Sequence, residues 1–202
     1  MTGPLITLED EFVGTSTTFS TGIETCDEMA GFSAIRNPGM ELVICRRALP
    51  SCLQTWLERM NPSHFPSIRV LVRPSDLRPA VEPYLDDCGM PLGDMRTLLL
   101  GDFDALVSSF ARITRSGLVD VRLERVCNDS CWKFHRDYVE ARLLTTYRGP
   151  ATEWVQPIHA EHALREQKLY KGPLERLLVH DVAIFKGNRA GPDSGIVHRA
   201  PP

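Results

Sequence analysis

Two residues whose side chains can bind a metal ion stand two positions apart, just before an apolar stretch. His135 and Asp137 precede the run from Ala141 to Tyr147. Side chains two positions apart on a β-strand point to the same face, so this imidazole and carboxylate would lie together. Burying such groups costs free energy unless a partner compensates them. The pattern leaves two interpretations open, a metal site and a buried His–Asp hydrogen bond without a metal.

A third candidate ligand stands near the end of the sequence. His198 follows the strand-like segment 195–197. Two histidines and one carboxylate form the facial triad of non-haem Fe(II) sites, which leaves coordination positions open. We therefore expect His135, Asp137 and His198 to bind one metal ion. The alternative for His198 is a surface histidine close to the terminus.

Cysteines add a second set of candidate ligands. Cys131 lies four positions before His135, so it is a candidate extra ligand or redox-sensitive neighbour of the metal. Cys127 and Cys131 could also form a structural zinc site with His159 and His162, although the spacing departs from finger and ribbon patterns. The alternatives are a packed thiol for Cys131 and solvent-facing side chains for both histidines.

The elements that must position these residues change in character near Gly117. Before it, hydrophobic periodicity and capping residues predict strands and helices. After it, alternating apolar and polar residues predict mainly strands, with a loop between them. The predicted strands cover residues 41–47, 68–72, 118–126, 139–147, 174–187 and 195–197, the predicted helices 50–60, 75–89 and 102–117, and the predicted loop 156–173.

This order of elements predicts an α+β fold, because no βαβ alternation is visible. We expect residues 1–37 to be an irregular N-terminal segment. Residues 38–117 would form a mixed or helical portion, packed on a strand-rich portion at 118–202. Together they would form one domain.

Composition excludes several classes of function. The chain has 202 residues, 43% of them hydrophobic and 24% charged, which suits a globular protein with a large core. The net charge is −3 and the basic residues are scattered, which argues against nucleic-acid binding. The sequence has neither an apolar run of roughly 20 residues nor a secretory signal, so we expect no membrane association and a cytoplasmic protein.

Three passages of the C-terminal part resemble Fe(II)/2-oxoglutarate dioxygenases, prolyl hydroxylases among them. His135-x-Asp137 followed by an apolar strand is similar to their HxD passage. Residues 149–154, GPATEW, resemble their Gly-Gly-x-Thr-x-Phe turn, and residues 180–187, HDVAIFKG, resemble the GDVLIF-x-G strand before the distal histidine. Over residues 119–202 the resemblance implies a double-stranded β-helix, a cupin-like jelly roll. It also implies Fe(II), 2-oxoglutarate as cosubstrate and an oxygenase activity.

The segments CWKFHRD, TTYRGPATEWV and VHRAPP resemble, more narrowly, an uncharacterised bacterial family of proteins of unknown function. Members of that family are often encoded beside zinc-regulated GTP-dependent metallochaperones. This second resemblance implies an alternative function. The chain would be a non-catalytic zinc-binding protein of metal homeostasis, with a metallochaperone as partner.

Strand parity suggests which residues would meet the cosubstrate of such an oxygenase. Thr145 and Tyr147 are expected to share the face of His135, so either of them could hydrogen-bond 2-oxoglutarate. These enzymes hold its far carboxylate with an Arg or Lys roughly ten positions beyond the distal histidine, whereas this sequence ends at Pro202. Arg142 or Arg148 could replace that residue. Arg142 has the opposite strand parity, which favours a carboxylate partner on a neighbouring strand.

Two further positions carry expectations of their own. His180 stands where the GDV pattern has glycine, so we expect a different start to that strand. Glu153 and Trp154 could line the mouth of the site. Packing of Trp154 in the core is the alternative.

Overall fold

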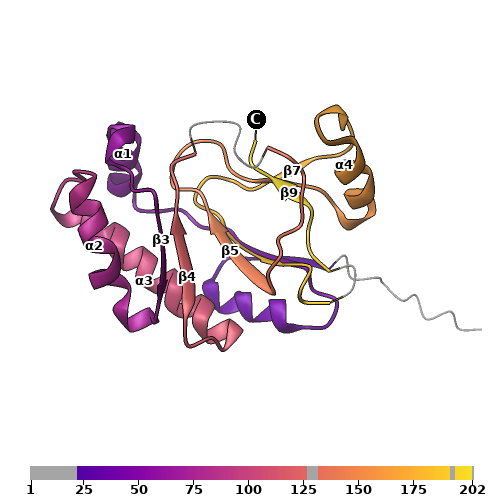
Figure 1. Ribbon diagram of the computed structural model, residues 1–202, viewed down its shortest axis with the longest axis horizontal. Helices are drawn as coiled ribbons and strands as arrows, with labels where there is room; N and C mark the ends of the chain where they lie inside the picture. Colours follow the sequence, from indigo (N-terminus) through magenta and orange to yellow (C-terminus); the bar gives the residue numbers. More distant parts are fainter. Residues whose placement is uncertain (1–21, 127–131, 192–193, 202) are drawn as a thin grey trace, which may run out of the picture.

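The three longest helices gather at one end of the molecule, whereas α4 (Ala160–Glu166) lies at the other end beside the strands β7 (Glu175–Arg176) and β9 (His198–Arg199) (Figure 1). The computed structural model describes residues 22–126, 132–191 and 194–201. Its α-helices are α1 (Ser51–Arg59), α2 (Leu77–Asp87), α3 (Asp94–Thr114) and α4 (Ala160–Glu166). Short 3-10 helices are η1 (Met29–Arg36), η2 (Pro62–His64), η3 (Pro74–Asp76), η4 (Pro157–His159) and η5 (Gln167–Leu169). The predicted α+β class is confirmed.

Helix α3 is the longest helix and joins the two ends of the molecule. It begins at Asp94, earlier than the predicted start at Asp102. The buried Leu99 and Leu100 extend the apolar face of the helix toward its N-terminus, beyond Asp102. It ends where Arg115 adopts a left-handed conformation with φ 56°, so Gly117 is not the residue that stops it. Asp102 therefore lies inside the helix, where its side chain is free to accept hydrogen bonds from other elements.

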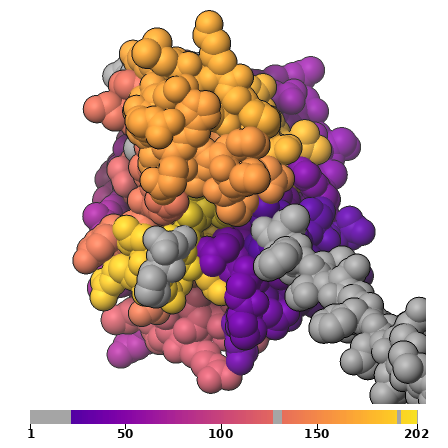
Figure 2. Space-filling model, turned by 90° about the vertical axis from the view of Figure 1, so that its right-hand side faces the viewer, coloured from indigo at the N-terminus to yellow at the C-terminus, as the bar shows by residue number. Residues whose placement is uncertain are grey.

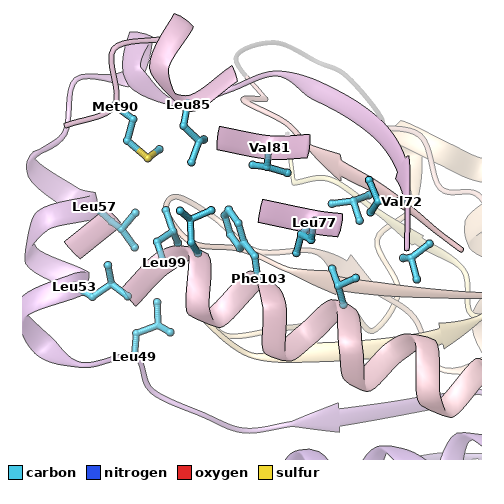
Figure 3. Packing of buried hydrophobic residues seen from close by; sticks show 14 of the residues in the cluster. Leu49, Leu53, Leu57, Val72, Leu77, Val81, Leu85, Met90, Leu99 and Phe103 are labelled. Atoms are coloured by element: carbon cyan, nitrogen blue, oxygen red, sulfur yellow. The ribbon is translucent and has the colours of Figure 1, made fainter. Parts of the chain in front are cut away.

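The largest hydrophobic core lies between the three long helices and the two-stranded sheet. Figure 3 shows leucines and valines of α1 and α2 pointing toward Leu99 and Phe103 of α3. The two-stranded sheet consists of β3 (Ile68–Val72) and β4 (Val119–Leu123), paired antiparallel, and Val72 closes the core from that side. This core fixes α3 as a platform for the sheet that follows.

A four-stranded sheet packs on the other side of α3. Its order is β1 (Ile23–Cys26), β2 (Leu42–Cys45), β8 (Val182–Lys186) and β5 (Ala141–Thr145). The β1–β2 pair is parallel, whereas β8 pairs antiparallel with both of its neighbours. Strand β8 is apolar along most of its length because it lies between two strands and is covered on both faces.

A small sheet packs against the far face of the four-stranded sheet. Its order is β7 (Glu175–Arg176), β6 (Glu153–Trp154) and β9 (His198–Arg199), all antiparallel. Trp154 and Ile196 meet Leu42, Ala183 and Phe185 of the larger sheet in a shared core. The candidate metal ligands lie at this junction between the two sheets.

The structure corrects two expectations about the elements and does not confirm the cupin-like jelly roll. Residues 23–36 form β1 and η1, so this part of the segment predicted to be irregular is ordered, whereas residues 1–21 lie outside the described part. The predicted loop 156–173 contains α4, whose buried side chains Ala160 and Ala163 pack on Phe134 and Val197. Among the described residues the strands form sheets of four, two and three strands that do not close into a barrel.

Helix α4 stands beside the C-terminal segment on the outside of the small sheet. Figure 2 shows the orange α4 region at the top of this face, above the yellow C-terminal residues. None of the helices in the described part of the chain has the length and apolar character needed to cross a membrane.

Candidate metal centre

Backbone pairing brings together two histidines that are far apart in the sequence. His135 and His198 form an antiparallel bridge, in which the amide of each donates to the carbonyl of the other at 3.0 Å. Residues that exchange both hydrogen bonds face each other directly, with their side chains on one face. The two imidazole rings accordingly lie 4.6 Å apart, centroid to centroid.

The carboxylate of Asp137 lies between these two rings. Its Oδ1 is 3.7 Å from Nε2 of His135, and its Oδ2 is 3.4 Å from Nε2 of His198. One donor atom from each of the three residues lies within 4.8 Å of the others. Two ligands held about 2.1 Å from one ion lie roughly 3.0–3.4 Å apart, so small side-chain rotations suffice to bind a cation.

Hydrogen bonds to the backbone orient both rings for metal binding. Nδ1 of His135 lies 2.8 Å from the Lys133 carbonyl, and Nδ1 of His198 lies 3.0 Å from the Ile196 carbonyl. A carbonyl only accepts, so each Nδ1 carries the proton, and Nε2 of a neutral ring keeps its lone pair. Metal-binding histidines are oriented in the same way in known sites.

Burial and charge at this point favour a bound cation. Burial lowers the pKa of His198, which favours its neutral ring. Its Nε2 lone pair then faces a carboxylate oxygen, so two electron-rich atoms oppose each other. Oδ2 of Asp137 is buried and has no hydrogen-bond partner among the described residues. A divalent ion would accept electron pairs from all these atoms, so the donor set fits a metal.

The end of β8 holds the loop that carries Asp137. The backbone amides of Gly187, Asn188 and Arg189 donate to the carbonyls of residues 140, 137 and 139, at 3.0, 2.9 and 3.2 Å. A Cβ on Gly187 would lie 2.7 Å from the Asp137 carbonyl oxygen and closer still to that of Val139. The loop can pass this closely only over a glycine, which gives a physical reason for the last residue of HDVAIFKG.

Apolar residues surround His198, and the site opens on the side of His135. The His198 ring lies 5.0 Å from the Phe185 ring, and Trp154 is its register partner on β6. The side chain of His198 is 5% exposed, whereas that of His135 is 35% exposed. The indole Nε1 of Trp154 is buried without a partner in the described part. A ligand of the metal would therefore approach past His135.

Arg142 contradicts the expectation from strand parity. Its Nη1 lies 3.1 Å from Oδ1 of Asp137, so it faces the triad and not the opposite side of the sheet. The chain bends at residues 138–140, before β5 begins. The alternation that starts at His135 is therefore interrupted, and the faces of β5 are exchanged relative to the prediction.

The same reversal moves the residues expected at the cosubstrate. Thr145 is the register partner of Val182, which belongs to the core toward η1 and α3, and its buried hydroxyl has no partner among described atoms. Tyr147 packs in the helical core and donates to Asp102. Both residues thus face away from the triad, which corrects the inward orientation predicted for them.

Arg148 also lies apart from the triad. Its Nη1 donates to the carbonyls of Leu57 and Met60, at 3.3 and 2.6 Å, near the C-terminal end of α1. These carbonyls have no partner within the helix. These contacts indicate that Arg148 joins the helical layer to the Gly149-Pro150 turn.

Asp102 of α3 forms the main polar link between the helical layer and the four-stranded sheet. Arg47 contacts both carboxylate oxygens of Asp102, and Tyr147 donates to the same group. Burial is the main cause that raises the pKa of Tyr147 well above its usual value of 10.0. The sequence suggested Asp102 as a helix cap, and only the tertiary contacts reveal this link.

His180 precedes β8 at the position where the dioxygenase pattern has glycine. His180 has φ 73°, in the left-handed region that favours glycine. Its Nε2 lies 3.2 Å from the Tyr147 carbonyl, and its own carbonyl accepts from Arg47 at 2.9 Å. These contacts stabilise a conformation that a non-glycine residue rarely adopts.

Glu153 lies on the face of β6 opposite to the triad. Its buried carboxylate accepts from Arg199 of β9 at 2.8 Å and from Arg176 of β7. It therefore ties together the three strands of the small sheet and is not a residue of the site mouth. Trp154, its neighbour, lies in the core between the sheets, as the packing interpretation predicted.

The remaining candidates do not extend the triad in the described part. Cys127 and Cys131 lie outside the described residues, so the prediction for Cys131 stays open. His162 is exposed and pairs with Glu166 at 2.8 Å, and His159 lies at the start of α4. The group of candidate metal ligands found among the described residues consists of His135, Asp137 and His198.

Fold and site together define a mixed α+β protein with a candidate metal site of two histidines and one carboxylate. A family model described as "Protein of unknown function (DUF1826)" matches residues 26–202, so the chain belongs to the DUF1826 family. This confirms the expected membership of an uncharacterised family. No curated protein and no solved structure matches the chain, and the resemblance to Fe(II)/2-oxoglutarate dioxygenases stays a prediction.

Proposed function

We propose that this protein binds Fe(II) through His135, Asp137 and His198 and acts as a 2-oxoglutarate-dependent oxygenase. The observation that carries this proposal is the set of two backbone-oriented Nε2 atoms around a buried carboxylate oxygen that lacks a hydrogen-bond partner in the described part of the chain. Fe(II) in such a triad supplies open coordination positions for oxygen and a cosubstrate. The three residues would hold the ion, and the Lys133 and Ile196 carbonyls would keep the rings in place.

The order of the strands supports a jelly-roll arrangement around this site. From His135 onward the chain contributes to the small sheet, then to the large sheet with β5, and to the small sheet again with β6 and β7. It returns to the large sheet with β8 and to the small sheet with β9. Passage between two facing sheets is characteristic of double-sheet jelly rolls. We include a partial double-stranded β-helix in the proposal on this ground.

Arg142 is the residue that we assign to a carboxylate of the cosubstrate. It is the arginine in contact with the triad, and its side chain is 39% exposed, so a ligand can reach it. Arginine suits this role because its planar guanidinium can bind a carboxylate through two hydrogen bonds. Thr145, Tyr147 and Arg148 lie elsewhere, so we no longer assign 2-oxoglutarate to them.

A zinc-binding function in metal homeostasis is the second candidate. The observation that favours it is the ion pair between Arg142 and Asp137. The guanidinium that we assign to the cosubstrate carboxylate is already paired in this arrangement. On this proposal the triad would hold Zn²⁺ without turnover. A metallochaperone would be its partner, as the narrower resemblance implies.

Turnover of 2-oxoglutarate separates the two proposals. The full chain is loaded with Fe(II) under anaerobic conditions, given 2-oxoglutarate and then exposed to oxygen, and succinate is measured. The oxygenase proposal predicts succinate above the level of a matched His135→Ala sample, because slow uncoupled turnover needs no added substrate. Bound metal with neither succinate nor any spectral change on adding 2-oxoglutarate would contradict the oxygenase and support the zinc-binding function.

A further inference from the structure

Two cysteines of the four-stranded sheet lie side by side on neighbouring strands. Cys26 ends β1 and Cys45 ends β2, and the two residues are direct partners in the parallel register. The amide of Arg46 donates to the carbonyl of Cys26 at 2.8 Å, which fixes the pairing at this end of the sheet. Both side chains belong to the core on the face that η1 and α3 cover.

Packing around this pair places the two thiols close enough to influence each other's pKa. Gly31 of η1 lies directly over Cys26, where an added Cβ would be 2.6 Å from its Cβ and 2.8 Å from its Sγ. The helix backbone therefore closes over Cys26 without a side chain between them. Cys45 is buried, whereas Cys26 is only partly buried, so Cys26 is the thiol that a reagent would meet first.

We propose that Cys26 and Cys45 form a reversible intramolecular disulfide that fastens β1 to β2. Neighbouring strands lie about 4.8 Å apart. Disulfides bridge Cα separations of roughly 4.4–6.8 Å. The bond therefore needs side-chain rotation and little movement of the backbone. It would close residues 27–44, which include η1, into a covalent loop at the edge of the sheet.

A low-molecular-weight disulfide such as oxidised glutathione is the oxidant. The Cys26 thiolate attacks one sulfur of glutathione disulfide and releases one reduced glutathione. The Cys45 thiolate then attacks the Cys26 sulfur and releases the second one. Two protein thiols lose their protons and two electrons in all, and one glutathione disulfide is reduced to two molecules of glutathione.

The reduced pair is expected to react slowly. Burial is the main cause that raises the pKa of both thiols, to about 11 for Cys45. The thiolate is the attacking species, so little of it is present near neutral pH. We therefore expect closure over hours, within the usual range for disulfide formation.

Peptide mapping of the oxidised full chain tests this proposal. The protein is incubated with oxidised glutathione, remaining thiols are alkylated, and non-reduced digests are analysed by mass spectrometry. We expect a peptide pair that links Cys26 to Cys45 and disappears on reduction. The Cys52→Ser control, at an exposed position of α1, should keep this link. The Cys45→Ser variant should instead carry glutathione on Cys26.

Two results would overturn the proposal. One is that Cys26 and Cys45 are both found alkylated, which means that they were still free thiols, although exposed Cys52 has reacted with glutathione. The other is that Cys26 is linked to any cysteine other than Cys45. Both results are read from the wild-type protein, so the test does not depend on whether a variant folds.

Discussion

Three residues carry the proposed chemistry, and residue types with spacing were enough to find them. His135 and Asp137 stand two apart, and His198 follows a short apolar segment. The structure brings their donor atoms within 4.8 Å. Arg142 was a candidate for the cosubstrate, but strand parity placed it on the wrong face, because bends at residues 138–140 reverse the faces of the next strand. Parity predicts side-chain direction only as far as the strand is continuous.

Replacing Arg142 with Met should destabilise the metal-free protein by about 1–3 kcal/mol, because the buried Asp137 carboxylate loses its charged partner. A divalent cation compensates that charge. The gain in the free energy of unfolding on adding Zn²⁺ should therefore be larger in the variant than in wild type, as measured by urea titration.

Arg122→Met is the matched control for this prediction. Arg122 pairs with Glu124 on the exposed side of the two-stranded sheet, where an ion pair contributes little. We expect its free energy of unfolding to change by less than about 0.5 kcal/mol. An equal metal-induced gain in Arg142→Met and wild type would show that Arg142 does not compensate Asp137.

At the scale of elements, the end of β8 positions the loop of Asp137, and Asp102 of α3 joins the helices to the strands. The sequence indicated most of these elements, because β8 and α3 have clear apolar patterns. It did not indicate α4, whose seven residues bury only Ala160 and Ala163 and thus give a weak pattern. The close approach at Gly187 depends on a loop 50 positions earlier, at Asp137, so no local pattern reveals it.

Gly187→Ala should displace the loop that carries Asp137. An added Cβ would clash with the carbonyls of Val139 and Asp137, which predicts a loss of about 1–3 kcal/mol in the free energy of unfolding. Metal affinity should fall at least about tenfold, which corresponds to about 1.4 kcal/mol. Isothermal titration with Zn²⁺ measures this affinity.

Gly117→Ala is the control, because no atom lies within 4 Å of the added Cβ. Unchanged affinity in Gly187→Ala would disprove the positioning role.

Tyr147→Phe should remove about 1–2 kcal/mol of stability near pH 7, because it deletes the hydrogen bond to Asp102. Burial raises the Tyr147 pKa well above 10.0 in the folded protein. As pH rises through about 10, the Tyr147 hydroxyl loses its proton in the unfolded chain but keeps it in the folded protein. The wild type therefore loses stability, whereas the variant, which lacks the hydroxyl, does not. The difference between them should therefore shrink at alkaline pH.

Urea unfolding at pH values from 7 to about 10.5 measures this difference. Tyr84→Phe is the control, because Tyr84 lies on the outer side of α2 and is 45% exposed. Its difference from wild type should stay small at every pH. A stability difference for Tyr147→Phe that stays constant or grows above pH 10 would contradict the assigned role of the buried hydroxyl.

At the scale of the whole molecule, α3 joins the helical core to the sheets that carry the candidate metal site. Its Leu99 and Phe103 lie in the helical core, whereas Leu106 and Ile113 pack on the four-stranded sheet. The sequence predicted the two halves but not the packing of α3 on the four-stranded sheet, because β2 and β8 of that sheet are paired across nearly 140 positions. We therefore expect one cooperative unfolding unit.

Leu85→Ala tests whether the molecule unfolds as one cooperative unit, because it changes the helical core at the end opposite to the candidate metal site. Leu85 is fully buried in the helical core, so its truncation should cost about 2–5 kcal/mol. Circular dichroism and metal release should shift to lower urea together. Leu92→Ala, at an 81% exposed position, should leave both midpoints in place. A metal-release midpoint that does not move in Leu85→Ala would show that the site unfolds independently.

Metal content is the most direct test of the account. Wild type, His135→Ala, His198→Ala and the control His162→Ala are purified alike, and iron and zinc are counted per chain. We predict near-stoichiometric metal in wild type and His162→Ala, because His162 is exposed and pairs with Glu166. Both triad variants should lose most of it. Equal metal content in all four proteins would contradict the shared site of His135, Asp137 and His198.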